Sequence, residues 1–290
     1  MRTVRFGFES MGTLWEITLW DEPNVQNVAR LKSTVLDYCQ RFDHTYSRFI
    51  KKSLIFALGD CSGLQKVPED LVTMLRLYKK LYDISCGKFT PLVADTLSDL
   101  GYDMDYSLNP KPIIRNVPLL NKAVKIIDAT HIKFNQKVTI DVGALGKGFA
   151  VDGIASILEG EGNTHYLING SGDIRYKGKE SIQVGLEHPL KMGQVIGKVD
   201  FLSGAMCSSA GNRRAWGGFH HIIDPDTRQS PTEIIASWVI APEAMIADAL
   251  ATALFLSPPE YFQQHFEFEY LLLNKHLRVK RSKGFAAELF

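Results

Sequence analysis

The strongest constraint on the fold is the sequence pattern beyond Ala123, where short segments of alternating apolar residues are separated by glycine turns. Such segments predict β-strands. Helical stretches over residues 147–160 and 243–256 interrupt them, and Gly160 and Gly162 end the first. Strands and helices do not alternate strictly as in a doubly wound parallel sheet. The pattern therefore predicts an α+β fold with mixed, mostly antiparallel sheets flanked by helices.

The expected strands in this part include, among others, residues 123–128, 131–134, 137–141, 164–170, 203–211 and 233–242, with a closing hairpin over 267–281. Residues 220–231 are expected to be a strand that runs into a turn.

The first 122 residues are richer in helix. Two short strands are expected around the "ESMGT" stretch, and amphipathic helices are predicted over residues 24–42 and 68–85. Residues 103–122 are polar and carry three prolines, which indicates a surface excursion. We expect one domain over residues 1–290, with sub-lobes at 1–122 and 123–290.

Composition excludes several classes of protein. A hydrophobic content of 45% and a charged content of 22% are ordinary for a globular chain. The formal net charge of +1 gives no global field for nucleic acid, and the basic stretch at 274–284 alternates as an edge strand would. The four cysteines form no C-x-x-C pair, and no apolar run is long enough to span a bilayer. We therefore expect a cytoplasmic protein without nucleic-acid or membrane partners.

A glycine-rich turn, "GALGKG", comes directly before the helix expected over residues 147–160. It matches neither the P-loop nor G-x-G-x-x-G. Glycines let a backbone approach a ligand, a helix start offers free N–H groups, and Lys147 adds a positive charge, so the turn suits a phosphate. Asp141 would repel a phosphate and suits a sugar hydroxyl, a ring N–H or a metal. A plain strand-to-helix turn explains the same residues.

Three further stretches carry candidate chemistry. Asp248 and Thr252 share one face of an apolar helix, and a carboxylate with a hydroxyl suits Mg²⁺, although a helix-start acid would look the same. In "HHIIDPD", His221 can accept a proton and Asp224 can orient a histidine, or the pair can be one core and one surface histidine. Small hydroxyl residues and two arginines fill 207–214, without a G-x-S-x-G nucleophile elbow.

The order of these motifs resembles that of one known family. The stretches "ESMGTLWEITLW", "YSRFIKKS", "CGKFTPLV", "IDVGALGKGFAVDGIASIL", "YLINGSGDIRYKG", "CSSAGNRRAWGGFHHIIDPDTRQSP" and "ADALATALFL" follow one another as in the ApbE family of flavin transferases. The resemblance runs from about Met11 to Leu256. It implies an enzyme that binds FAD, uses Mg²⁺ to break its pyrophosphate, passes FMN to a Thr or Ser hydroxyl of an acceptor flavoprotein, and releases AMP.

The resemblance also implies roles for individual residues. Those expected to contact FAD are Met11, Phe49, Lys88, Phe89, Thr90, Asp141 and Lys147. Mg²⁺ would be held by the carbonyl near Ala144 together with Asp248 and Thr252, and His221 would be the general base or a positioning residue.

The chain departs from the family pattern at several positions. Thr90 stands where Asp is common, Gly146 where Ala is usual, and Ser171 and Arg228 where Gly is common. None of these departures removes a proposed metal ligand or the histidine. Two alternative functions remain: an FAD pyrophosphatase that makes FMN and AMP, and a flavin-binding protein without catalysis.

Overall fold

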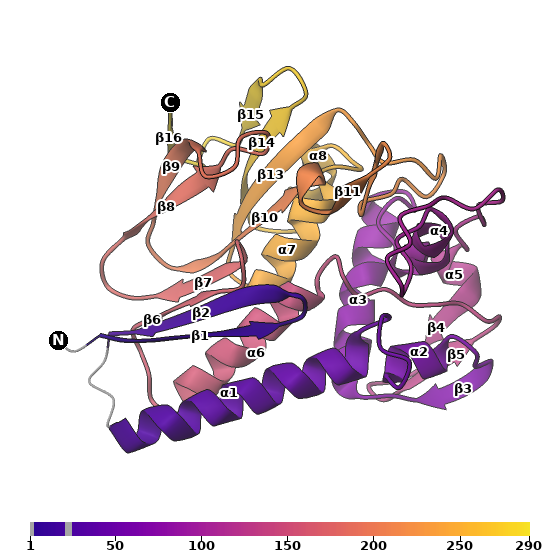
Figure 1. The fold of residues 1–290 in the computed structure, drawn as a ribbon, viewed down its shortest axis with the longest axis horizontal. Helices are drawn as coiled ribbons and strands as arrows, with labels where there is room; N and C mark the ends of the chain where they lie inside the picture. Colours follow the sequence, from indigo (N-terminus) through magenta and orange to yellow (C-terminus); the bar gives the residue numbers. More distant parts are fainter. Residues whose placement is uncertain (1–2, 21–24) are drawn as a thin grey trace.

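An antiparallel sheet forms the centre of the computed structural model, which describes residues 3–20 and 25–290 (Figure 1). In the described part the sheet has eight strands in the order β1-β2-β6-β7-β10-β13-β14-β15. They are β1 (Val4–Ser10), β2 (Thr13–Leu19), β6 (Tyr166–Asn169), β7 (Ile174–Lys177), β10 (Gly204–Ala210), β13 (Ile234–Ala241), β14 (Glu269–Asn274) and β15 (Val279–Arg281). With its flanking helices, this architecture confirms the predicted α+β class.

Both faces of the sheet are covered. Successive residues of a strand point to opposite faces, and in β10 Met206 joins one hydrophobic core while Cys207 joins the other. The same alternation separates Trp238 from Val239 in β13. One face packs against a smaller sheet of order β16-β9-β8, made of β8 (Ile182–Glu187), β9 (Val195–Phe201) and β16 (Ala287–Leu289).

Helices cover the other face. Helix α7 (Ala244–Ala253) packs on β10 and β13, α6 (Gly146–Gly160) packs on β6, β7 and α7, and α1 (Val25–Tyr46) lies along α6 (Figure 1). Leu31, Val35 and Cys39 of α1 are buried in this layer. The burial of these three residues confirms the helical spacing expected of the amphipathic stretch over 24–42.

Helices α6 and α7 hold each other's starts. The Asp152 carboxylate of α6 accepts the N–H groups of Ala244 (3.0 Å) and Met245 (2.9 Å) at the beginning of α7. In return, the Asp248 carboxylate of α7 accepts the N–H of Gly148 (2.9 Å) in the first turn of α6. Each contact satisfies a helix-terminal N–H group that has no partner within its own helix, so the two starts are fixed side by side.

The rest of the chain builds a helical lobe beside this sandwich. It contains α2 (Leu54–Leu58), α3 (Glu69–Ile84), α4 (Ala94–Asp99), α5 (Leu120–Ala123), α8 (Pro259–Phe262) and a sheet of β3 (Gly63–Lys66), β5 (His131–Phe134) and β4 (Val124–Ile126). One hydrophobic core includes residues of both parts, such as Leu71 of α3 and Val239 of β13. Pairing of β2 with β6 and of β3 with β5 crosses the predicted sub-lobe boundary at residue 122.

Most predicted elements are confirmed, with one correction. Residues 137–141 form no strand: the N–H of Asp141 bonds Pro91 O and the Asp141 carbonyl accepts the Tyr78 hydroxyl, so these backbone groups are satisfied outside any sheet. The strand expected to run into a turn over 220–231 is the short β12 (Phe219–His220), which pairs with β11 (Ala215–Trp216) and is followed by a turn. The basic strand β15 lies at a sheet edge, as predicted. Across the described residues, no helix is long and apolar enough to cross a membrane.

A loop over residues 101–116 folds back onto α4 and is held there by one carboxylate. Asp99, which is 3% exposed, accepts the Arg115 Nε (2.6 Å) and Nη2 (2.8 Å) atoms and the Lys111 Nζ atom (3.0 Å). Burial opposes the ionisation of Asp99, but these charged donors outweigh it and hold its pKa at about 2. Tyr102 lies at the start of this loop, so the contacts of Asp99 also help to fix an aromatic side chain.

We predict that Asp99→Asn lowers the free energy of unfolding at pH 7 by about 2 kcal/mol, since a pKa lowered from 3.8 to about 2 corresponds to roughly that stabilisation. A depressed carboxyl pKa contributes above the unfolded-state value and is lost as the pH falls through the folded-state value. Urea titrations should therefore show the difference roughly halved at pH 3. Asp60→Asn, which removes an exposed pair with Lys137, is the control and should change little. Equal differences at both pH values would contradict the prediction.

Candidate active site

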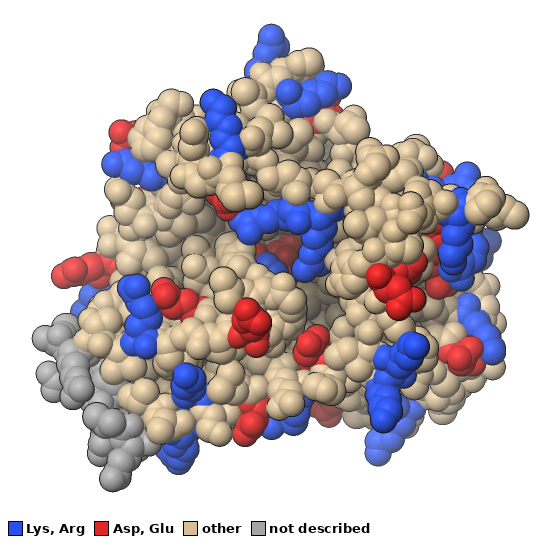
Figure 2. Space-filling model, viewed as in Figure 1, with Lys and Arg blue, Asp and Glu red and all other residues tan. Residues whose placement is uncertain are grey.

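A cavity of about 780 Å³, lined by both polar and apolar residues, opens between the sandwich and the helical lobe. Figure 2 shows a hollow near the centre of one face with basic side chains along its rim, and Arg213 and Arg214 are exposed residues that line the cavity. Nine of the residues predicted for the site also line it: Met11, Phe49, Thr90, Asp141, Ala144, Lys147, His221, Asp248 and Thr252.

The glycines around Lys147 serve helix packing. A Cβ atom on Gly148 would lie 2.3 Å from the Ala244 carbonyl oxygen, and one on Gly153 would lie 2.0 Å from the Tyr38 hydroxyl. Neither neighbour leaves room for a side chain, so these glycines let α7 and α1 approach α6. The close packing brings the start of α6 to the cavity wall, where Ala144 and Gly146 line it.

The positive charge of Lys147 interacts with two carboxylates, those of Asp173 and Asp248. Its ammonium forms an ion pair with Asp173, which is fully buried, and donates to Gly170 O at 3.3 Å. Burial lowers the pKa of Lys147, but the charges of Asp173 and Asp248 outweigh burial and raise it. Burial, together with the charge of Asp173, raises the pKa of Asp248 well above its usual range. Lys147 therefore balances the protein's own acids at the cavity wall.

Asp248 shares the cavity lining with residues that carry further oxygen atoms. Thr252 follows it by one turn of α7, the Thr252 and Ser209 hydroxyls lie 3.2 Å apart, and Ala144 lines the same cavity. Among the described residues, no group of three or more His, Cys, Asp or Glu side chains could hold a metal by itself. One carboxylate with hydroxyl and carbonyl oxygens fits Mg²⁺, which binds few protein ligands and completes its shell with water and substrate phosphate.

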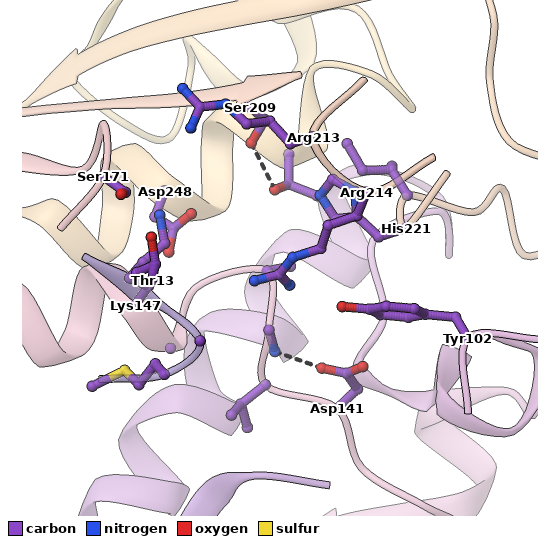
Figure 3. A pocket seen from close by; sticks show the side chains of 18 of the residues that line it. Thr13, Tyr102, Asp141, Lys147, Ser171, Ser209, Arg213, Arg214, His221 and Asp248 are labelled. Carbon is purple, nitrogen blue, oxygen red and sulfur yellow. Dashed lines mark hydrogen bonds between the residues drawn. The ribbon is translucent and has the colours of Figure 1, made fainter. Parts of the chain in front are cut away.

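His221 and Arg214 line the cavity across from Asp248 (Figure 3). Burial, and then the charge of Arg214, lowers the pKa of His221 to about 3, so its ring is neutral at ordinary pH. The His221 Nδ1 atom is buried and has no hydrogen-bond partner among the described residues. Figure 3 shows the Arg214 guanidinium pointing into the space between Lys147 and Tyr102.

Asp141 lies on the wall opposite Lys147 and is paired with an arginine. Its carboxylate accepts the Arg48 Nε–H at 2.7 Å and the Gly143 N–H at 2.6 Å. The Tyr78 hydroxyl donates to the Asp141 carbonyl at 3.0 Å and lies 3.3 Å from the N–H of Ala144. These contacts fix the turn before α6.

Three predicted site residues do not line the cavity. Phe89 is buried and stacks on Tyr78 with ring centroids 5.1 Å apart. Lys88 donates to both carboxylate oxygens of Asp224, at 2.9 and 2.8 Å, and pairs with Asp226. The Asp224 carboxylate therefore holds a lysine in place of the expected histidine, because the turn after His221 folds against the end of α3.

Left-handed backbone occurs at the cavity wall in residues other than glycine. Met11, Tyr106 and Ser171 line the cavity with φ angles of 52°, 50° and 58°. Such conformations are strained for side chains other than glycine and persist only where the surroundings hold them. Ser171 and Arg228, which replace glycines common in the ApbE pattern, both adopt it, so the positions keep a glycine-like backbone without the glycine.

Sequence reasoning missed several residues of the site. Arg48 stood within the quoted "YSRF" stretch and Asp173 within "NGSGD", but nothing in spacing pairs them with Asp141 and Lys147. Arg214 is one of the two arginines within residues 207–214, and its sequence context assigns it no role. Tyr102 and Tyr106 fall in the predicted surface excursion or at its edge, and only the fold brings them to the cavity.

Fold and site together define an α+β protein with a large cleft whose charged residues come from segments far apart in the sequence. The sequence model of the ApbE family matches residues 11–271, and the chain belongs to this family.

Named relatives and solved structures resemble the chain along most of its length. Proteins named FAD:protein FMN transferase from Escherichia coli (strain K12) and Rhodobacter capsulatus are 24% and 28% identical to it, each over 87% of this chain and over 78% and 51% of their own lengths. The ApbE protein of Thermotoga maritima superposes with a TM-score of 0.87 at 21% identity, and flavin transferase ApbE from Vibrio cholerae with 0.81 at 19%. Both structural matches cover 98% of each chain and show the same fold.

We predict that Lys147→Met lowers the free energy of unfolding by about 3–5 kcal/mol, because it leaves buried carboxylates without their cation. Adding Asp173→Asn should recover part of that loss, which chemical denaturation of the single and double variants would measure. Lys177→Met, which breaks an exposed pair with Glu159, is the matched control. A double variant as unstable as the sum of the two single variants would argue against the shared-charge arrangement.

Proposed function

We propose that this protein is an FAD:protein FMN transferase that moves FMN from FAD to a Thr or Ser hydroxyl of an acceptor flavoprotein and releases AMP, with Mg²⁺ as cofactor. The observation that carries the proposal is one cavity in which Asp248, Thr252 and Ser209 face Arg214 and His221. Oxygen donors for a hard cation, an arginine for phosphate and a neutral imidazole are the groups that such a transfer needs.

Arg214 is the residue best placed to donate hydrogen bonds to a phosphate group. The structure records no hydrogen bond or ion pair of its guanidinium with any described side chain, and it points into the cavity. A guanidinium can donate two parallel bonds to phosphate oxygens. Lys147, whose ammonium is taken by Asp173 and Gly170, would contribute mainly its charge.

His221 supplies a proton acceptor. Its ring is neutral at ordinary pH, and the negative charge of a bound pyrophosphate would raise the low pKa of His221. The ring could then take the proton of the acceptor hydroxyl as the hydroxyl oxygen attacks the phosphorus of the FMN half. The bond from that phosphorus to the bridging oxygen breaks, and AMP leaves with the electron pair. Asp248, Thr252 and the carbonyl near Ala144 would hold Mg²⁺. When bound, it would neutralise charge on the pyrophosphate.

Two alternatives share this cavity. With water in place of the acceptor hydroxyl, the same groups would hydrolyse FAD to FMN and AMP. A protein that only stores FAD would use Arg214 and the aromatic rings of Phe49, Tyr102 and Tyr106, and would need no proton acceptor. The His221 Nδ1 atom is buried and has no hydrogen-bond partner in the described part of the chain, which favours a catalytic protein over the storage protein. The cytoplasmic location of the acceptor remains a prediction from the sequence.

The function is tested by incubating the protein with FAD and Mg²⁺, with and without co-expressed candidate acceptors. We expect AMP in amounts equal to covalent FMN on a Thr or Ser, read by mass spectrometry of the acceptor. Fast, repeated AMP release without an acceptor would establish the pyrophosphatase instead. FAD that stays intact with every acceptor would leave only the binding protein.

We predict that Asp248→Ala abolishes Mg²⁺-dependent AMP release while the protein stays folded. The substitution removes the carboxylate among the proposed metal ligands. It also removes the acceptor of the Gly148 N–H, and Asp248→Asn tests that contribution separately because its side chain keeps an oxygen acceptor. A second readout is the rise in melting temperature with Mg²⁺ and FAD together, which both variants should lose. Asp60→Ala, at an exposed position, is the control. Undiminished AMP release from the folded Ala variant would refute the metal assignment.

A further inference from the structure

Arg48 is a charged residue in an unusual place. It follows α1 and is 8% exposed, although a buried charge is costly unless it is paired and hydrogen-bonded. Its Nε atom donates to Asp141 Oδ2 (2.7 Å), its Nη2 atom to the Tyr102 carbonyl (2.9 Å) and its Nη1 atom to Ser98 Oγ (3.3 Å). The guanidinium thus ties three separate segments together at the cavity wall.

The same guanidinium lies against aromatic rings. Its Cζ atom is 4.2 Å from the centroid of the Phe49 ring and 5.1 Å from that of Tyr102. Phe49 stacks on Tyr106 with centroids 5.2 Å apart and planes 10° from parallel, and Tyr102 stacks on Trp216 at 5.3 Å. Phe49, Tyr102 and Tyr106 all line the cavity and are called the aromatic wall below.

The aromatic wall needs such support. Tyr102 and Tyr106 belong to the loop that Asp99 clasps from outside, and Tyr106 has a strained φ of 50°. A strained, loop-borne ring keeps one orientation only when neighbouring contacts over-determine it. Arg48 provides these contacts from the inside, through the Tyr102 carbonyl and the face of Phe49.

We propose that Arg48 is a positioning residue that holds the aromatic wall as a binding subsite for a planar ring of the nucleotide substrate. The inference rests on the proposed function for the identity of that substrate. FAD carries two planar rings, the isoalloxazine of its FMN half and the adenine of its AMP half, and either can stack on an aromatic side chain. By locking Asp141 as well, Arg48 keeps a carboxylate acceptor at the edge of this subsite.

This role predicts an effect on binding more than on turnover. Arg48 contacts the wall and Asp141, and its loss should loosen the subsite without removing His221 or Asp248. An interaction made equally with bound substrate and transition state changes KM and leaves kcat nearly constant. Lysine keeps the charge but lacks the planar fork that reaches Asp141, Tyr102 and Ser98 together.

The test compares Arg48→Met and Arg48→Lys with the wild-type protein, using flavin fluorescence to titrate FAD and AMP release to measure rates. We expect about a tenfold weaker Kd and a correspondingly higher KM for the Met variant, with kcat within about twofold, and a smaller loss for the Lys variant. Arg41→Met, at an exposed position of α1, is the matched control. All titrations are run below the melting temperature of the least stable variant.

A double-mutant cycle of Arg48→Met and Phe49→Leu distinguishes a role of Arg48 in positioning the aromatic wall from a role in the stability of the fold alone. If Arg48 acts through the wall, the losses of FAD affinity in Arg48→Met and Phe49→Leu are less than additive in the double variant. Calorimetric titration with FMN and with AMP then identifies the ring, since only the ligand that stacks on the wall weakens in Arg48→Met. Unchanged affinity for FAD, FMN and AMP in a folded Arg48→Met protein would overturn the inference.

Failure of the inference and failure of the proposed function give different results. Wild-type protein that binds FAD and releases AMP, beside an Arg48→Met variant that binds FAD equally well, overturns only the role of Arg48. Wild-type protein that binds FAD without ever releasing AMP overturns the transferase and leaves the subsite to be judged by the titrations. Wild-type protein that binds no FAD overturns both.

Discussion

The reciprocal contact between α6 and α7 is the constraint on which the rest of the site depends. Asp152 caps the start of α7, Asp248 accepts an N–H from the start of α6, and Gly148 lets the two backbones meet. The contact places Lys147 and Ala144 beside Thr252, about a hundred residues later in the chain. Because Asp248 serves both as a helix partner and as a cavity wall, fold and chemistry share one carboxylate.

Charge is distributed unevenly around the cavity. On the α6–α7 side, Lys147 is surrounded by Asp173 and Asp248, so that wall is close to neutral or acidic. Arg48 is paired with Asp141 on the opposite wall, and Arg214 is left to face the cavity from the rim. Under the proposed function, the phosphates of FAD would lie nearest Arg214.

Most helices and strands could be predicted from local sequence patterns. The features that could not be predicted depend on contacts between residues far apart in the sequence. The short apolar segments at β10 and β13, bounded by glycine or proline, and the helical spacing of α3 predicted those elements, since buried strands and buried helix faces leave apolar residues in such patterns. Residues 137–141 have a strand-like composition but bond Pro91 and Tyr78, which no local pattern encodes. Likewise Asp248 and Thr252 were found by their shared helix face, whereas Asp173 and Arg48 matter only through partners in other segments. The division into sub-lobes remains a prediction.

The order in which the cavity walls occur along the chain has a consequence during synthesis. Met11 comes from the first hairpin, Arg48 and Tyr102 from the helical lobe, Lys147 from α6, and Asp248 and Thr252 from a helix that ends at Ala253. Strand β6, made late, must pair with β2, made early. A nascent chain therefore cannot assemble the complete cavity until α7 has left the ribosome.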